Sequence, residues 1–255
     1  MKDKIKIFAY VGSCNVNSTT GIIMRELVRC IQDETGLEVV MTEFCGSKCD
    51  IKECVGCTQC FVAGKCALDC KDDMSEIRKR MLEADCIILG SPVYFHAVSG
   101  NMKKFMDRIS YWTHTMELMG KAGITVATSG GNGLKYVSDY LRKFMDYLGV
   151  LDVGTIETAA FNKQYMINEK TLDKMQPMLH NCAKAVKDYL VDGHIPAVSR
   201  MQKDVFLMYK KRYEELKEYI DDVDEIRRWY DRGFNEYDCF EDALRAIYKT
   251  APSLN

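Results

Sequence analysis

The stretch ADCIILGSPVYFHAVSGNMKKFMDR, residues 84–108, joins a predicted strand to a predicted helix through a loop. Its apolar run Cys86–Leu89 is typical of a parallel strand that is buried on both faces. We expect Gly90-Ser91-Pro92 to end that strand, because proline has no N–H for the ladder. After the loop, apolar residues recur at helical spacing and predict a helix over Met102–Ile109. Ligands of open parallel sheets bind beyond the carboxyl ends of the strands, so the loop is a candidate ligand edge.

Strands and helices alternate on both sides of this stretch. Further strands are predicted at Ile5–Tyr10, Glu38–Phe44, Gly123–Ser129 and Val150–Phe161. Further helices are predicted at Gly21–Glu34, Met74–Glu83, Leu134–Leu148 and Leu172–Val191. Asp72-Asp73 is expected to cap the second of these helices. Such alternation predicts an α/β fold with a doubly wound five-stranded parallel sheet.

Pro196 marks a domain boundary, with residues 1–195 expected to form the α/β domain and 196–255 a helical extension. The predicted helices Ser199–Tyr230 and Glu241–Tyr248 are charged and rich in aromatic residues, with neither a glycine-rich loop nor a metal-ligand spacing. We interpret the extension as a cover for the core or for a partner subunit. Its aromatic residues are expected to offer apolar surface to a second copy of the chain.

The composition of the chain limits which cellular compartment and which kinds of partner we expect. The 255-residue chain has a net charge of −2, which gives no electrostatic reason to expect nucleic acid or an anionic membrane as a partner. No apolar run approaches membrane-spanning length and the first residues do not resemble a signal peptide, so we expect a cytoplasmic protein. Twelve cysteines in such a protein favour metal or redox chemistry, and five of them fall between Cys54 and Cys70.

The first predicted strand is followed by GSCNVNSTT, residues 12–20, at the start of a predicted helix. The unpaired N–H groups and the dipole of a helix N-terminus favour a phosphate, and serine and threonine hydroxyls add donors. Neither a Walker lysine nor a G-x-G-x-x-G pattern is present, which excludes the P-loop and the dinucleotide fingerprint. The loop is therefore a candidate anion site of another kind.

The segment 45–73 contains the spacing C-x2-C-x2-C-x5-C, formed by Cys54, Cys57, Cys60 and Cys66. Four cysteine thiolates at short spacing are typical ligands of an iron–sulfur cluster. A structural zinc site and redox-active thiols remain alternatives, because both use closely spaced cysteines. Three further cysteines could each replace one of the four: Cys45, Cys49 and Cys70.

Two stretches resemble motifs of one known family. Ser91-Pro92-Val93-Tyr94 together with Met102–Arg108 is similar to the S-P-x-Y…(L/M)-K-x-F-x-D-R signature of the NADPH-dependent FMN reductase branch of flavodoxin-like proteins. The loop 12–20 resembles the phosphate loop of that family, G-S-x-x-x-x-S-x-T. The resemblance extends from Lys4 to Asp192 and implies a flavodoxin-like fold with FMN as the cofactor.

The resemblance also implies which residues contact FMN. Those expected at the phosphate are Ser13, Asn15, Ser18, Thr19 and Thr20. Those expected near the ring are Pro92, Val93, Tyr94, Phe95 and His96. The glycine-rich loop after the fourth strand is expected near the ring as well, with Ser129, Gly130, Gly131 and Gly133. No catalytic acid or base is assigned.

The cysteine spacing is similar to the compact motif of iron–sulfur flavoproteins, which implies a [4Fe–4S] cluster. An FMN-dependent oxidoreductase is thus implied, passing electrons between a reduced donor, NAD(P)H or ferredoxin, and an acceptor that is a small molecule or a redox partner protein. A homo-oligomer, dimer or tetramer, is expected. Because the cysteine segment follows the second strand, we expect cluster and FMN at the same rim of the sheet. Three alternatives stay open: a flavodoxin-like electron carrier, a flavin-only NAD(P)H:FMN reductase with an empty cysteine motif, and a zinc-binding interaction module.

Overall fold

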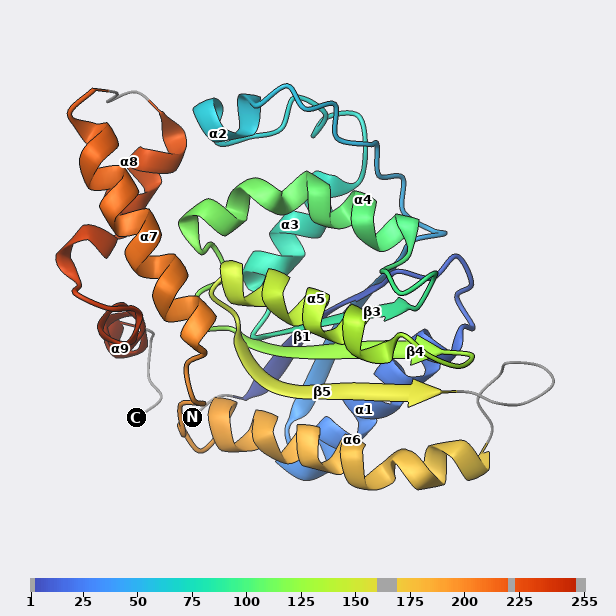
Figure 1. Ribbon diagram of the computed structural model, residues 1–255. Helices are drawn as coiled ribbons and strands as arrows, with labels where there is room; N and C mark the ends of the chain where they lie inside the picture. The colour runs from blue at the N-terminus through green and yellow to red at the C-terminus, as the bar shows by residue number, and fades with distance from the viewer. Residues whose placement is uncertain (1–2, 160–168, 220–222, 251–255) are drawn as a thin grey trace.

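The computed structural model describes residues 3–159, 169–219 and 223–250, which contain a sheet of five parallel strands (Figure 1). The strands are β1 (Lys4–Val11), β2 (Glu38–Cys45), β3 (Cys86–Pro92), β4 (Ala122–Ser129) and β5 (Leu151–Ala159). Their order in the sheet is β2-β1-β3-β4-β5. In register, Ile7 lies beside Cys86, and Cys86 lies beside Ala122. The predicted α/β fold with a parallel sheet is confirmed.

Helices cover both faces of this sheet. Those of the domain are α1 (Thr19–Thr35), α2 (Gln59–Ala63), α3 (Met74–Glu83), α4 (Gly100–Ile109), α5 (Leu134–Tyr147) and α6 (Glu169–Leu190), with the 3-10 helix η1 (Ser110–Thr115) after α4. α1 and α6 pack on one face, in one apolar layer with Ile5 and Ile7 of β1. α3, α4 and α5 pack on the other face, in a second layer with Phe8 and Tyr10. The doubly wound arrangement follows, because successive side chains of a strand point to opposite faces.

The predicted helices and strands are present, with ends shifted by a few residues. α1 begins at Thr19 because Ser18 caps it, accepting a hydrogen bond from Gly21 N at 3.2 Å. It ends at Gly36, whose φ of 66° is the left-handed conformation of a helix C-cap. Phe161, the predicted end of the fifth strand, lies outside the described residues. None of the helices in the described ranges is both long enough and apolar enough to span a membrane.

Gly90-Ser91-Pro92 ends the third strand as expected, but the strand includes all three residues and does not stop at Leu89. β3 continues to Pro92, and its last two residues pair with Ala127 and Thr128 of β4. β1 pairs with β3 only as far as Gly90. Pro92 therefore lies beyond the end of the pairing with β1. Because no strand pairs with that side of β3 there, a proline without an N–H is tolerated.

The extension lies beside the α/β domain and covers part of it (Figure 1). It consists of α7 (Arg200–Lys217), α8 (Asp224–Asp231), the 3-10 helix η2 (Phe234–Glu236) and α9 (Phe240–Thr250). Gln202 Nε2 donates to Val150 O at 2.9 Å, and Tyr213 Oη donates to His114 O at 3.1 Å. These bonds join α7 to the start of β5 and to η1, so the interpretation of the extension as a cover for the core is confirmed.

One expectation for the extension is wrong. Ser199–Tyr230 is not one helix: α7 ends at Lys217 and α8 begins at Asp224. A straight helix rises about 1.5 Å per residue, which would carry Trp229 far from Phe206. The reversal instead brings the two rings to 5.2 Å. Phe206 and Trp229 are 0% exposed and belong to one apolar cluster, whereas Tyr219 is 82% exposed. Most of the aromatic residues thus pack within the chain, and the expected surface for a second copy stays a prediction.

Candidate functional site

Three loops lie together at the carboxyl edge of the sheet, after β1, β3 and β4 (Figure 1). Backbone hydrogen bonds join them: Gly12 N donates to Gly90 O at 2.8 Å, and Val93 N donates to Thr128 O at 2.8 Å. Ser99 Oγ, at the start of α4, donates to Gly12 O at 2.5 Å. The ligand edge that the sequence predicts is therefore one connected unit.

The loop between β1 and α1 is ordered by its own polar groups. Asn15 N donates to Ser13 Oγ at 3.1 Å, and Ser18 N donates to Asn15 O at 3.0 Å. The next residues enter α1, whose first turn, described in full, contains no acidic residue. Nothing in that turn opposes an anion at the positive end of the helix dipole. The structure thus gathers Ser13, Asn15 and Ser18 in one turn at a helix N-terminus.

The two threonines of this loop are buried. Thr19 is 9% exposed and Thr20 is 1% exposed. Thr20 Oγ1 lies 2.7 Å from Thr128 Oγ1 of β4, so its hydroxyl is bonded within the protein. Thr20 can still offer its backbone N–H, because the first turn of a helix has no internal acceptors for its amides. The sequence did not single out Thr128, since nothing local marks a threonine inside a strand as a partner of α1.

The loop after β3 is a tight reversal. Tyr94 and Ala97 exchange backbone hydrogen bonds at 3.0 and 3.1 Å, and the two residues between them, Phe95 and His96, have φ values of 49° and 61°. Left-handed conformations are costly for residues that carry a Cβ, and they concentrate at functional sites. Tyr94 is 58% exposed and Phe95 is fully exposed, so both rings are available to a ligand or a partner.

The glycine-rich loop after β4 packs against that reversal. Gly133 has a φ of 83°, and a Cβ there would lie 2.7 Å from His96 Cδ2 and 2.8 Å from Val93 Cγ1. His96 Nε2 lies 3.2 Å from Asn132 Oδ1, and the His96 ring stacks on Tyr136 at 5.2 Å. Asn132 and Tyr136 thus belong to the site although the sequence did not single them out, because neither type is distinctive in a loop or on a helix surface.

Side-chain bonds also order the glycine-rich loop itself. Ser129 Oγ donates to Asn132 O at 2.6 Å and accepts from Gly131 N at 3.0 Å. Gly130 and Gly131 are exposed, and Pro92 of the neighbouring loop is half-buried. The predicted residues of the second and third loops therefore surround one exposed edge.

The cysteine segment leaves the carboxyl end of β2 but does not stay there. Gly46 N donates to the last carbonyl of β1 at 2.9 Å, and the chain then runs over α4 until α2 reaches α8 (Figure 1). Phe61 of α2 stacks on His114 of η1 at 4.8 Å. The expectation of one shared rim is therefore wrong for the later part of this segment. α4 leads away from the rim at 1.5 Å per residue, so Arg108 lies on the order of 14 Å from Ser99 along the helix.

The four predicted cluster ligands lie near one another in this segment. Cys54 and Cys57 are exposed, and Cys60 and Cys66 are partly buried. Burial raises the pKa of Cys60 to about 11, and the neighbouring thiolates add to that increase. In the described ranges no group of three or more His, Cys, Asp or Glu side chains is arranged to hold a metal ion. The thiols are therefore gathered in one region without converging on one point.

The backbone around these cysteines turns repeatedly. Gly56, Thr58 and Gly64 have φ values of 66°, 59° and 69°. Of these three residues, Thr58 has the highest conformational energy in the left-handed region, because its Cβ disfavours that conformation. Such turns allow residues close in sequence to present their side chains to a common centre. The segment thus supplies four thiols, which match an iron–sulfur cluster in the number and type of its ligands although they do not converge on one point.

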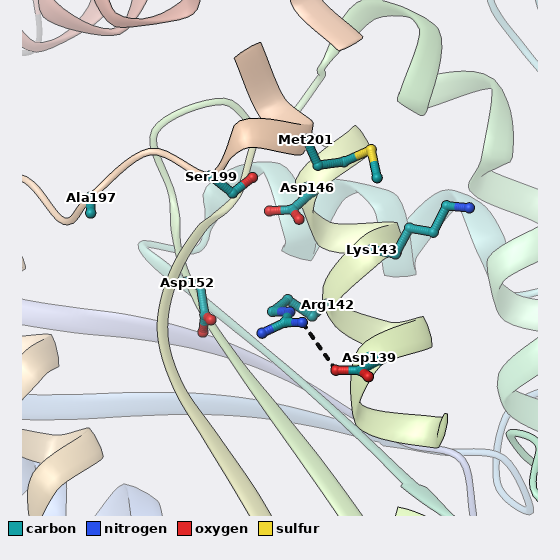
Figure 2. A pocket seen from close by; sticks show the side chains of 8 residues that line it. All are labelled: Asp139, Arg142, Lys143, Asp146, Asp152, Ala197, Ser199 and Met201. Atoms are coloured by element: carbon teal, nitrogen blue, oxygen red, sulfur yellow. Dashed lines mark hydrogen bonds and ion pairs between the residues drawn. The ribbon is translucent and has the colours of Figure 1, made fainter. Parts of the chain in front are cut away.

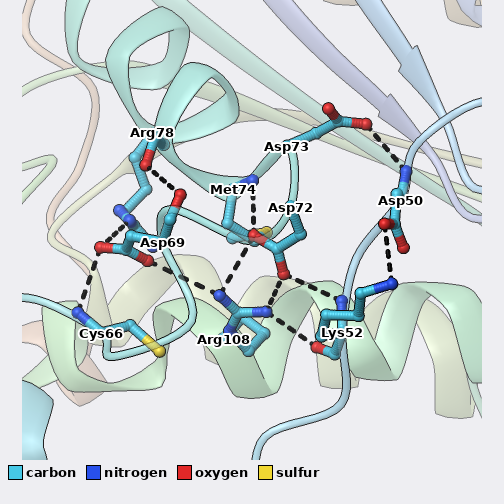
Figure 3. Close-up of polar contacts among 10 residues, drawn as sticks. Asp50, Lys52, Cys66, Asp69, Asp72, Asp73, Met74, Arg78 and Arg108 are labelled. Carbon is cyan, nitrogen blue, oxygen red and sulfur yellow. Dashed lines mark hydrogen bonds and ion pairs between the residues drawn. The ribbon is translucent and has the colours of Figure 1, made fainter.

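A fully buried ion pair fastens the cysteine segment to α4 (Figure 3). The side chains of Arg108 and Asp72 are both 0% exposed and make two hydrogen bonds to each other. Arg108 Nη1 also donates to Lys52 O at 2.9 Å. Asp72 accepts from Lys52 N at 2.9 Å and from Met74 N at 3.1 Å. The pair thus holds the chain before Cys54 and the chain entering α3 against the same helix.

Hydrogen bonding keeps both members of this pair charged. Burial acts to raise the pKa of Asp72, but the bonds from Arg108 and from two backbone N–H groups outweigh it and lower the pKa. Burial likewise acts to lower the pKa of Arg108, but Asp72 and the nearby Cys66 thiolate raise it. The sequence signature identifies Arg108, but nothing in the sequence identifies Asp72 as its partner.

Asp69 connects the ion pair to the fourth predicted ligand. It pairs with Arg78, lies 3.6 Å from Arg108 Nη2, and accepts a hydrogen bond from Cys66 N at 3.1 Å (Figure 3). The sequence did not single out Asp69 or Arg78, because charged residues near a helix start usually face solvent.

The expected capping by Asp72-Asp73 is only partly correct. Asp73 occupies the N-cap position of α3 but makes no side-chain cap, and it accepts from Asp50 N at 2.8 Å instead. Asp72 Oδ1 takes the N–H of Met74, the first residue of the helix. Both carboxylates therefore also hold the start of the cysteine segment, through Asp50 and Lys52.

A hollow of about 520 Å³ lies at the opposite edge of the sheet, near the start of β5 (Figure 2). Asp146 of α5 and Ser199, which precedes α7, are among its lining residues. Asp146 is 6% exposed, and burial raises its pKa to about 6 against the opposing hydrogen bond from Ser199. This hollow is separate from the three loops and from the cysteine segment, so we assign no part of the predicted site to it.

Comparisons with known proteins agree with the geometry. A family profile described as NADPH-dependent FMN reductase matches residues 5–164. An iron-sulfur flavoprotein of Methanocaldococcus jannaschii is 34% identical over 159 residues, which are 61% of this chain and 79% of that protein. An iron-sulfur flavoprotein of Clostridioides difficile is 24% identical over 226 residues, 87% of this chain and 96% of that protein. That second alignment is longer than the region before Pro196, so it includes part of the extension.

Among solved structures, the apo form of an NADH:FMN oxidoreductase superposes with a TM-score of 0.53 at 19% identity, over 71% of this chain and 89% of that one. At this identity the superposition speaks for the fold alone, and it confirms the predicted flavodoxin-like arrangement.

Proposed function

The chain belongs to the NADPH-dependent FMN reductase family and is a flavin-dependent oxidoreductase, and from this premise we propose its cofactors and its reaction. It transfers electrons from NAD(P)H or reduced ferredoxin to a small molecule or a redox partner protein, with FMN and a [4Fe–4S] cluster as its cofactors. Bound FMN supplies the chemistry that exchanges electrons in pairs or singly, and the protein supplies binding and placement.

One observation carries the flavin assignment: three loops from different strands are bonded into one edge beside a helix N-terminus. Ser13, Asn15 and Ser18 form the turn that would hold the phosphate, with the first-turn amides of α1 as further donors. The left-handed Phe95 and His96 and the close packing of Gly133 order the wall that would hold the ring.

A comparison of FMN with riboflavin tests this phosphate site. In Ser18→Ala we expect FMN affinity to fall about tenfold or more, because hydrogen bonds to a charged group are worth about 1.5–3 kcal/mol, while riboflavin affinity stays the same. Ser199→Ala is the matched control, since Ser199 caps α7 through Gln202 N in the same way but at the other edge. Equal losses for both flavins in Ser18→Ala would contradict the assignment of this loop.

For the cluster, the support is the thiol set Cys54, Cys57, Cys60 and Cys66 on a backbone that contains a left-handed threonine, Thr58. The relatives from Methanocaldococcus jannaschii and Clostridioides difficile carry the name iron-sulfur flavoprotein, which is consistent with the same use of the segment here. Arg108 and Asp72 would hold this segment in place on α4.

Anaerobic reconstitution tests the cluster. We expect iron and sulfide to be incorporated together, and Cys57→Ser to lose both while FMN stays bound and is still reduced. Cys239→Ser is the matched control, because Cys239 lies in the extension and bonds to Asp242. Incorporation of zinc without sulfide would replace the cluster by a structural metal site. Binding of neither metal would leave a flavin-only reductase.

The identity of the electron donor distinguishes the reductase hypothesis from the electron-carrier alternative. Rapid bleaching of the flavin by NADPH or NADH alone is expected for a reductase, measured anaerobically by the loss of flavin absorbance. Reduction by ferredoxin only, with no direct reaction with either nicotinamide, would favour the electron-carrier alternative.

We further propose that the chain works as a homo-oligomer in the cytoplasm. Tyr94 and Phe95 at the flavin edge and Tyr136 and Tyr140 on α5 are exposed aromatic residues that a second copy can cover. A reducing compartment would keep the cysteine ligands available. Phe95→Asp should lower the mass measured by sedimentation, and an unchanged mass would argue against this surface.

A further inference from the structure

A second hollow, of about 440 Å³, lies between the cysteine segment, α3, η1 and α8. Its volume is in the range of small-molecule sites. It is lined by Gly64, Lys65, Asp69, Ser75, Arg78, Lys79, Leu82, Glu83, Tyr111, Trp112 and Arg228. None of the three loops assigned to FMN contributes to it, so it needs an explanation of its own.

The charges around this hollow are predominantly positive. Four of its lining side chains are cationic and two are carboxylates. Asp69 pairs with Arg78 and Arg108, and Glu83 pairs with Arg80 on the surface of α3. Arg228 is likewise neutralised, by Glu117 and Asp224. In the part of the chain that the structure describes, Lys65 and Lys79 make no ion pair. The hollow therefore holds an excess of positive charge that an anion would balance.

Arg78 is the buried member of this set. It is 7% exposed, and its Nη2 is bonded to Asp69. Its Nη1 is buried and has no hydrogen-bond partner among the described residues. A buried donor without a partner is costly, and a guanidinium group matches the geometry of a carboxylate or a phosphate. This unpaired donor is the observation that points to a ligand rather than to a merely charged surface.

Part of the lining of the hollow is apolar and aromatic. Trp112 is 3% exposed and Tyr111 is 6% exposed, and both belong to η1. Burial raises the pKa of Tyr111 to about 12, so its hydroxyl stays neutral and adds no negative charge. Leu82 adds apolar surface one helical turn after Arg78, on the same helix α3. Apolar and aromatic surface together with a few charged groups is the usual composition of a small-molecule site.

We propose that this hollow binds a small organic anion, whose carboxylate or phosphate is held by Arg78 with Lys65 and Lys79 and whose apolar body lies against Leu82 and Trp112. The site adjoins the fourth predicted ligand, because Lys65 precedes Cys66 directly. It also adjoins the extension through Arg228 of α8. The proposal depends neither on FMN nor on a cluster, since none of its contacts involves their residues.

Calorimetry on the FMN-loaded full chain tests the site with four probes: phenyl phosphate, benzoate, inorganic phosphate and benzyl alcohol. We expect phenyl phosphate or benzoate to bind, with the tighter of the two identifying the head group. Inorganic phosphate should bind more weakly than phenyl phosphate because it lacks the apolar body. Benzyl alcohol, which is neutral, should not bind. Equal affinity for benzyl alcohol, or no binding of either organic anion, would overturn the proposal.

Variants assign the binding to these residues. Lys79→Met, an exposed change, should weaken the anion about fivefold, and Arg78→Lys should weaken it about tenfold or more while preserving the charge beside Asp69. Lys211→Met is the matched control, because it removes a lysine of α7 that is 80% exposed and does not line the hollow. Anion binding should change tryptophan fluorescence, and Trp112→Phe should abolish that signal. Binding that both Lys79→Met and Arg78→Lys leave unchanged would place the anion elsewhere and refute the site.

Discussion

Replacement of Arg108 by Met should destabilise the protein more than any exposed charge change on the same helix. Methionine keeps an unbranched apolar stem but removes the guanidinium that faces Asp72. Both side chains are 0% exposed, so the Asp72 carboxylate is left buried without its cation. Removing one partner of a buried pair costs about 3–5 kcal/mol, and the lost bond to Lys52 O adds about 1 kcal/mol. Two backbone N–H groups still bond Asp72, which favours the lower part of that range.

Urea unfolding followed by circular dichroism measures this change. We expect a loss of about 3–5 kcal/mol in the free energy of unfolding, and a melting temperature lower by roughly 10 °C. Lys103→Met is the matched control, because Lys103 pairs with Asp107 on the exposed face of α4. That change should cost no more than about 0.5 kcal/mol. Limited proteolysis should show faster cleavage within residues 52–73 in Arg108→Met only, since the pair holds both ends of the segment.

The pH dependence provides a second measure. Asp72 has a lowered pKa, so its contribution to stability is complete above the pKa of an unfolded aspartate and is lost as the pH falls through the lower folded value. Arg108→Met should reduce this loss on the acid side. The reasoning would be refuted by a change in unfolding free energy below about 1 kcal/mol together with proteolysis equal to that of Lys103→Met.

Three further outcomes are expected. The pKa of Asp146 is raised to about 6, so the folded state loses stability as the pH rises from about 4 to 6. Asp146→Asn should therefore be more stable than the parent at pH 7. Urea unfolding should show a gain on the order of 1–2 kcal/mol. Gly133→Ala should weaken FMN binding in a fluorescence titration, because its Cβ would meet His96 at 2.7 Å, whereas Gly100→Ala, with open space around it, should not. Deletion of residues 197–255 should lower the melting temperature by about 10 °C or more and abolish near-UV dichroism from its buried aromatic residues.

Much of the fold was predictable because it depends on local patterns. A strand buried on both faces needs a continuous apolar run, and Ile5–Tyr10 and Cys86–Leu89 show one. A helix needs its first N–H groups satisfied, and Ser18 supplies that cap beside a loop rich in hydroxyls. Local chemistry of this kind placed the loops after β1, β3 and β4, since each follows directly from the end of a strand.

The remaining features were decided by contacts between distant parts of the chain. Arg108 and Asp72 are 36 positions apart, and Thr20 and Thr128 are 108 apart. No local pattern shows which carboxylate will neutralise a given arginine, because that choice arises only when packing removes water from both. The course of the cysteine segment over α4 likewise depends on contacts between distant residues, such as the pair Arg108–Asp72. By itself the sequence determined which residues form strands, helices and candidate ligand loops, whereas the tertiary structure decided which buried charges pair, because a charge without water must find its partner wherever the fold places one.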